Sequence, residues 1–147
     1  MKFSKFDLRM FNAAHVEAEK SDYERFHVGC VITYKKKIIG RGHNSNKSSP
    51  LQAEYNKYRN FNNTEGCFIR HSIHAEIAAI SSVSYLNCIE VEWNKASAYV
   101  YRICPGKELG YGDAKPCPAC MNALKDMGIK NIFFTDDMGY NYLHLED

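Results

Sequence analysis

Two short motifs that lie far apart in this chain of 147 residues constrain the fold most strongly. The sequence H-A-E at 74–76 stands at the start of one predicted helix, and C-P-A-C at 117–120 stands at the start of another. A C-x-x-C pair that opens a helix directs both thiolates at one cation, and the helix N-terminus favours their negative charge. A catalytic zinc commonly takes three protein ligands and keeps its fourth position for water. We therefore predict that His74, Cys117 and Cys120 bind Zn2+.

Glu76 follows the predicted ligand His74 by two residues, where a carboxylate can lie near the metal without being a ligand itself. Such a group can accept a proton from water and pass it to a substrate nitrogen. Each motif alone has a simpler interpretation. A C-x-x-C pair can be half of a structural zinc site or a redox pair, and H-A-E can lie on a solvated helix face. The two motifs together favour a catalytic site in which Glu76 transfers protons.

Composition is that of an ordinary globular chain, and we expect residues 1–147 to form one domain. The formal net charge of +2 is too small to indicate or to exclude a nucleic-acid surface. No apolar run approaches the about 20 residues of a membrane span, and the chain start lacks the apolar core of a secretory signal. We therefore expect a cytoplasmic protein with reduced cysteines. Cys30 and Cys88 lie among apolar residues and are expected to be core side chains.

The hydrophobic pattern predicts an α/β domain with three layers. The stretch 45–69 has no clean period, so we expect an ordered loop there with one helical turn near 51–61. About a dozen residues follow Asp136, too few for a helical crossover, so the last strand is expected to be antiparallel to its predecessor. The expected elements are helices over 4–20, from His74 and over 118–128, and strands over 27–34, 37–44, 97–103, 130–136 and 140–146.

H-x-E followed by P-C-x-x-C, which begins here at Pro116, resembles the signature of the zinc-dependent nucleobase deaminases. The order of elements is similar to that of the cytidine and deoxycytidylate deaminase superfamily: a leading helix, a hairpin ending in G-H-N, the H-A-E helix, a strand, the C-x-x-C helix and a strand. The resemblance implies a three-layer α-β-α cytidine deaminase-like fold with a central mixed five-stranded sheet. It also implies Zn2+ as cofactor, Glu76 as the catalytic residue and assembly into a homo-oligomer.

The resemblance further assigns three residues to substrate binding. Asn44, which closes the second predicted strand, resembles the family asparagine that hydrogen-bonds the sugar or base, although a turn residue would also fit there. Phe26 precedes the first strand, where the family often places a side chain that packs on the base, and a core aromatic is the alternative. Ala75 would offer its backbone to the amine or carbonyl of the base.

A second metal site is a further implication of the resemblance, because some deoxycytidylate deaminases bind a structural zinc near the region before the H-A-E helix. Cys67 and His71 precede that helix closely, and Cys104 is a further candidate ligand. A free thiol and a surface imidazole are the simpler interpretation.

Three departures from the family pattern concern the choice of substrate. The segment between the two motifs is long, and the loop over 51–66 is expanded as in deoxycytidylate deaminases. An antiparallel last strand, in contrast, is typical of free cytidine deaminases. Lys47, Lys57, Arg59 and Arg70 could meet a phosphate, although a solvated basic loop is the simpler explanation for each.

Our preferred hypothesis is the hydrolytic conversion of cytosine to uracil in a free nucleoside or nucleotide, such as cytidine or dCMP, with release of ammonia. The small net charge favours such a small-molecule substrate over a polynucleotide. The main alternative is a deaminase that acts on cytosine or adenine in single-stranded DNA or RNA, including tRNA, on which Tyr55, Tyr58 and Phe61 could stack. A non-catalytic, zinc-stabilised binding module is a third hypothesis, but it gives Glu76 no purpose. Guanine and pterin-like bases are further possible substrates, because deaminases of these bases share the core motif.

Overall fold

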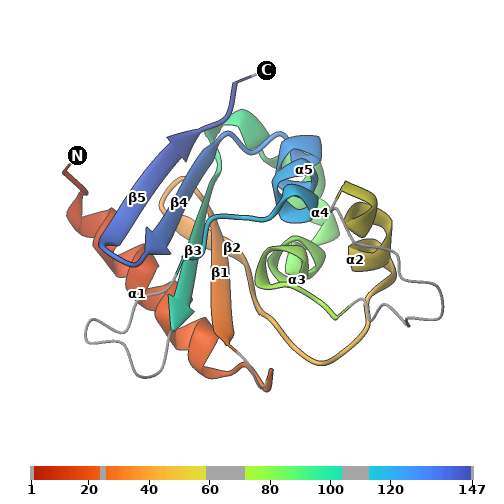
Figure 1. Cartoon of the computed structure of the whole chain (residues 1–147). Coiled ribbons are helices and arrows are strands. Elements are labelled where there is room, and N and C mark those ends of the chain that lie inside the picture. Colours follow the sequence, from red (N-terminus) through yellow and green to blue (C-terminus); the bar gives the residue numbers. More distant parts are fainter. Residues whose placement is uncertain (1, 24–25, 59–71, 104–112, 147) are drawn as a thin grey trace.

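A mixed sheet of five strands lies between helices in the computed structural model, which describes residues 2–23, 26–58, 72–103 and 113–146 (Figure 1). The strand order is β2-β1-β3-β4-β5, with β3 and β4 parallel and the other neighbours antiparallel. The helices are α1 (Lys5–Glu19), α2 (Pro50–Tyr55), α3 (Ala75–Ser82), α4 (Tyr85–Glu90) and α5 (Pro118–Met127). The strands are β1 (His27–Tyr34), β2 (Lys37–His43), β3 (Ser97–Ile103), β4 (Asn131–Asp136) and β5 (Gly139–His144). Short 3-10 turns span Asn56–Tyr58 and Trp93–Lys95.

Helix α1 covers one face of the sheet, and α3 and α5 cover the other (Figure 1). Because side chains alternate along a strand, neighbouring residues enter different cores. Val31 and Tyr99 pack with Phe11 of α1, whereas Cys30 and Val100 belong to the core beneath α3 and α5. The three-layer α-β-α fold with a mixed five-stranded sheet is therefore confirmed.

Two glycines allow the helices to approach the sheet closely. A Cβ at Gly29 on β1 would lie 2.1 Å from the carbonyl oxygen of Ala14 in α1, a separation that Cβ atoms essentially never show. On the opposite face, a Cβ at Gly42 on β2 would lie 2.5 Å from the amide nitrogen of Ala79 in α3. The β1–β2 hairpin is thus held between two helices at backbone contact, and this contact sets the position of α3.

The longer elements begin and end close to their predicted bounds. Ser4 caps α1 in a reciprocal capping box with Asp7, and Gly128 ends α5 in the left-handed conformation at φ 97°. Strand β5 pairs antiparallel with β4, as predicted. No helix in the described ranges has the length and hydropathy needed to cross a membrane.

Of the two short helices, α2 lies where a helical turn is predicted, whereas α4 is not evident in the hydrophobic pattern. Helix α2 begins at Pro50 in the stretch predicted to be a loop with one helical turn. Helix α4 has no buried residue, so its sequence lacks the regular spacing of apolar residues from which a helix is predicted. Its Cys88 is exposed, and the prediction of a core thiol there is wrong because the apolar residues around it do not pack inward. Cys30 is buried, as predicted.

Candidate active site

The starts of α3 and α5 bring the three predicted metal ligands together. His74 is the N-cap of α3, and Cys117 is the N-cap of α5. The Nδ1 atom of His74 lies 3.6 Å from Sγ of Cys117 and 3.3 Å from Sγ of Cys120. The three ligand atoms all lie within 4.8 Å of one another, and no other group of this kind occurs within the described ranges.

The spacing of these atoms fits tetrahedral zinc. Bonds of about 2.3 Å to sulfur and about 2.0 Å to nitrogen, at tetrahedral angles, place the sulfur and the nitrogen about 3.5 Å apart. The two sulfur–nitrogen separations of 3.3 and 3.6 Å bracket that value. Two thiolates and one imidazole are also a ligand set that zinc prefers, and three protein ligands leave one position open.

A hydrogen bond between the two cysteines shifts their pKa values in opposite directions. The hydrogen bond with Cys120 lowers the pKa of Cys117 to about 3, and His74 lowers it further against the effect of burial. The pKa of Cys120 is raised, first by its hydrogen bond to Cys117 and then by burial. The lowered pKa of Cys117 favours its thiolate form, and a cation bound by both sulfurs would also displace the proton of Cys120.

Glu76 lies in the first turn of α3, and only 5% of it is exposed. Burial raises the pKa of its carboxyl group, and the neighbouring His74 lowers it. Glu76 lines the same cavity as His74 and Cys117. The arrangement places a group that can hold a proton beside the metal-ligand candidates, where a reacting base could reach it.

The cavity has a volume of about 150 Å³, and all three residues assigned to substrate binding line it. Phe26 is half-buried beside the start of β1. Ala75 is fully buried as the first residue of α3. Asn44 is 4% exposed; its Oδ1 accepts from the amide of Val28 at 2.9 Å, and its Nδ2 donates to the carbonyl of Phe26 at 3.0 Å. The amide of Asn44 thus holds the start of β1, and a substrate contact would use its second Nδ2 hydrogen or its second Oδ1 lone pair.

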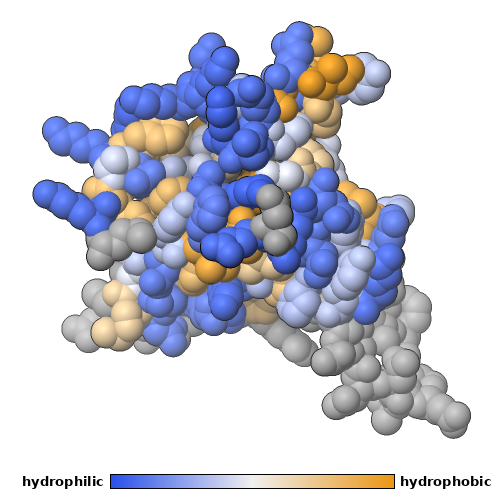
Figure 2. Space-filling model, turned by 90° about the horizontal axis from the view of Figure 1, so that it is seen from above, coloured by the Kyte–Doolittle hydropathy of each residue, from blue (hydrophilic) through white to orange (hydrophobic). Residues whose placement is uncertain are grey.

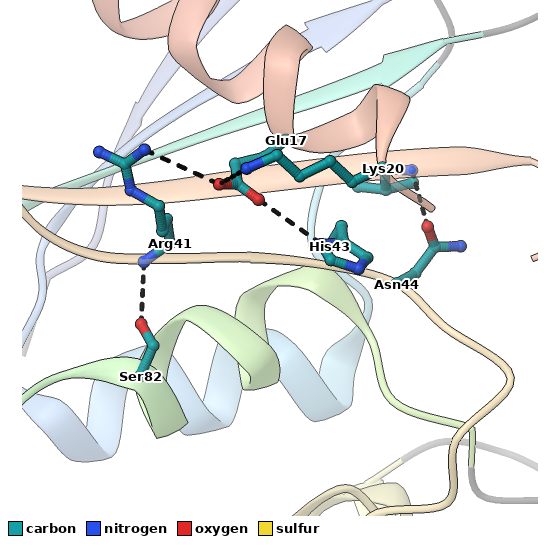
Figure 3. A network of polar contacts seen from close by, with 7 residues as sticks. Glu17, Lys20, Arg41, His43, Asn44 and Ser82 are labelled. Carbon is teal, nitrogen blue, oxygen red and sulfur yellow. Dashed lines mark hydrogen bonds and ion pairs between the residues drawn. The ribbon is translucent and has the colours of Figure 1, made fainter. Parts of the chain in front are cut away.

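A buried carboxylate fixes the end of β2 next to Asn44 (Figure 3). Glu17 of α1 is 4% exposed. Its Oε2 lies 3.5 Å from Nδ1 of His43, and its Oε1 lies 3.9 Å from Nη1 of Arg41. The backbone amide of Arg41 donates to the hydroxyl of Ser82 in α3 at 2.9 Å. These contacts connect α1, β2 and α3, so they hold the strand end that Asn44 follows.

Gln52 of α2 positions His74 and carries no motif that would mark it in the sequence. It is fully buried, and its Oε1 accepts from the backbone amide of His74 at 2.9 Å. Its Nε2 donates to Oδ1 of Asn56 at 2.8 Å. Only a fold that brings α2 against the start of α3 reveals this role.

Two cations, Arg102 and Lys115, also line the cavity. The guanidinium of Arg102 lies 4.5 Å from the ring centroid of Phe26, and its Nη1 donates to the carbonyl of Asp113 at 3.3 Å. Its Nε is buried and has no hydrogen-bond partner in the described part of the chain. Neither cation forms an ion pair with a carboxylate of the described residues. Two carboxylates, those of Glu76 and Asp113, line the cavity as well, so acidic and basic side chains both face it.

The other basic and metal-binding candidates are separate from this cavity or are not described. Neither Lys47 nor Lys57 lines it, and Nζ of Lys57 lies 5.2 Å from the ring centroid of Tyr58. The remaining candidate residues lie outside the described part of the chain. They are Arg59, Phe61, Cys67, Arg70, His71 and Cys104.

Fold and site together define an α/β domain with a zinc-type ligand set and a buried carboxylate beside it. The sequence profile of the cytidine and deoxycytidylate deaminase zinc-binding region matches residues 4–136. The chain therefore belongs to this family, whose cofactor is zinc. No curated protein matches the sequence significantly.

Three solved structures share the fold. A cytidine deaminase from Burkholderia pseudomallei has a TM-score of 0.60 and 17% identity, over 97% of this chain and 93% of that one. The dCMP deaminase of cyanophage S-TIM5 has a TM-score of 0.58 and 14% identity, over 92% and 86% of the two chains. RibD from Acinetobacter baumannii has a TM-score of 0.50 and 21% identity, over 90% of this chain and 28% of that one.

Proposed function

We propose that this chain is a zinc-dependent hydrolytic deaminase that converts cytosine to uracil in a free nucleoside or nucleotide. The observation that carries the proposal is the position of Glu76, which is buried in the same cavity as the metal-ligand candidates. Burying a carboxylate is costly, and a purely structural zinc site would not need one there. A proton-transfer role explains its presence.

The proposed reaction uses Glu76 twice. Zinc, when held by His74, Cys117 and Cys120, lowers the pKa of a water molecule toward neutrality. Glu76 accepts a proton from this water and donates it to N3 of cytosine, which makes C4 electrophilic. The water oxygen forms a bond to C4, and Glu76 carries the second proton to the amino nitrogen. The bond between C4 and this nitrogen then breaks, so that uracil and ammonia are the products.

The residues around the cavity would hold the base. Phe26 can pack on the ring, the backbone of Ala75 can meet its amine or carbonyl, and Asn44 has hydrogen-bonding capacity left for the base or sugar. These roles are part of the proposal, and the shared cavity supports them.

Arg102 and Lys115 support a substrate that carries a phosphate. A guanidinium without an ion-pair partner in the described residues is suited to bind a phosphate through charge-assisted hydrogen bonds. A solved structure of the cyanophage enzyme, which shares 15% identity with this chain, is in complex with dCMP and dUMP.

The test is a mass-spectrometric panel of cytidine, deoxycytidine, CMP, dCMP, guanine, single-stranded oligonucleotides and tRNA. We expect conversion of a free cytosine nucleotide, and loss of that conversion in Glu76→Gln. Glu54→Gln, which changes an exposed glutamate of α2, is the matched control and should keep the activity. Failure of zinc-loaded protein to convert any substrate would refute the proposal.

We also propose that copies of this chain associate. Helix α4 presents three large apolar side chains to solvent, with exposed fractions of 82% for Tyr85, 62% for Leu86 and 63% for Ile89. Such a grouping is typical of protein interfaces. Light scattering after size-exclusion chromatography would reveal the assembly, and a monomer at all concentrations would contradict it.

A further inference from the structure

A second cavity, of about 520 Å³, lies at the end of the sheet where β3 and β4 begin. It shares no lining residue with the candidate active-site cavity. Strands β3 and β4 begin at the top of Figure 1. Figure 2 looks down on that end, where hydrophilic side chains project around smaller hydrophobic areas. The volume lies within the range of small-molecule sites, about 300–1,000 Å³.

Aromatic rings line the inner part of this cavity. The ring of Tyr99 stacks on Phe133 with centroids 4.3 Å apart. Phe6 meets Tyr99 edge-on at 6.5 Å, and Phe3 meets Phe133 at 6.3 Å. Phe3, Phe6 and Phe133 are only partly buried, so they offer apolar surface to a planar ring of a ligand.

Positive charge surrounds the opening of the cavity. Asp7 is the one carboxylate among the lining residues, and its Oδ1 already accepts from a tyrosine hydroxyl at 2.6 Å. One of the cations, Lys95, forms an exposed ion pair with Glu92 at 3.0 Å. The four exposed lysines that line the cavity are Lys2, Lys35, Lys36 and Lys95.

Two of these lysines occupy backbone positions that suit other residues. Lys35 and Lys36 form the two-residue turn between β1 and β2, with φ angles of 50° and 62°. Turns with two positive φ angles strongly select asparagine and glycine. The presence of two lysines is therefore not explained by turn formation, and an unfavourable backbone of this kind is typical of functional positions. Their charge beside an aromatic cavity supplies the reason.

From these features we propose that the second cavity binds a nucleoside di- or triphosphate, with the base against the aromatic rings and the phosphates between the lysines. Inorganic phosphate alone would leave the rings without a contact, and an uncharged aromatic molecule would leave the lysines without one. A nucleic-acid strand is bound along an extended groove, whereas these residues line a single open cavity. The site is separate from the candidate active site and does not depend on the proposed deamination.

Calorimetric titration of zinc-loaded protein with ADP and ATP tests the proposal, with adenosine and tripolyphosphate as separate probes. We expect saturable binding of the nucleotides, at least about tenfold tighter than that of either fragment, because each fragment makes only part of the contacts. Absence of saturable nucleotide binding would overturn the proposal. Tripolyphosphate that binds as tightly as ATP, or a single-stranded oligonucleotide that binds more tightly, would also overturn it.

A turn variant locates the binding without damage to the fold. Lys35→Asn combined with Lys36→Gly removes two charges and provides residues that suit the turn. We expect this variant to weaken ATP binding at least about tenfold, because charge-assisted hydrogen bonds to phosphate are lost. Lys37→Gln removes an adjacent exposed charge that does not line the cavity, and it should change the affinity by less than about twofold. Equal affinities of the turn variant and the unmodified protein would place the nucleotide elsewhere.

Discussion

Replacement of Gln52 by leucine tests whether α2 positions the metal ligand His74. Leucine fills a similar volume but cannot accept from the His74 amide at 2.9 Å or donate to Asn56 at 2.8 Å. Because Gln52 is fully buried, water cannot take its place in these two bonds. A buried polar group deprived of its partner costs about 1–3 kcal/mol, so the two losses together should lower the free energy of unfolding by about 2–6 kcal/mol.

The variant should also bind zinc more weakly, since the backbone of His74 loses the contact that orients it. Loss of a group that orients a metal ligand typically lowers affinity by about 10–100-fold. Urea unfolding of the metal-free protein measures the first effect. Competition with a chromophoric chelator measures the second.

A destabilised variant elsewhere in the core separates positioning from general loss of stability. Ile132→Ala on β4 removes a fully buried side chain and should cost about 2–4 kcal/mol. It should leave zinc affinity within about twofold, because Ile132 belongs to the large core and is not a metal-ligand candidate. The reasoning is refuted if Gln52→Leu keeps its zinc affinity, or if Ile132→Ala loses as much.

Three further predictions follow from particular contacts. Gly29→Ala should destabilise the protein by about 3 kcal/mol in urea unfolding, because the new Cβ meets the α1 backbone; a loss below about 1 kcal/mol would contradict this contact. Cys120→Ser should lose bound zinc in elemental analysis after dialysis, whereas Cys88→Ser, which changes an exposed thiol, should retain it. If CMP is a substrate, Arg102→Gln should lower kcat/KM for CMP by at least about tenfold, because a charge-assisted hydrogen bond is lost. The same variant should change kcat/KM for cytidine little. An equal fall in kcat/KM for CMP and for cytidine would argue against phosphate recognition.

The metal-ligand candidates and the longer elements could be predicted because their signals are local. The capping box of Ser4 and Asp7 lies within four residues, and Gly128 marks the end of α5 by its own backbone conformation. The H-A-E and C-x-x-C motifs, each at a helix start, likewise indicate together a metal site without knowledge of the fold. Helix α4 escaped prediction because it buries no side chain, and exposure of Cys88 could not be inferred from the apolar residues beside it.

The sequence by itself determined the family, the candidate zinc ligands, the carboxylate beside them and the antiparallel last strand. These depend on residue type and short spacing, which are properties of a segment. The tertiary structure alone decided that Gln52 supports His74 and that Arg102 lines the same cavity as His74 and Cys117. It also decided that lysines from the chain start and from the β1–β2 turn share an aromatic cavity. Such groupings arise from the packing of helices on both faces of a sheet, which brings together residues that no local pattern relates.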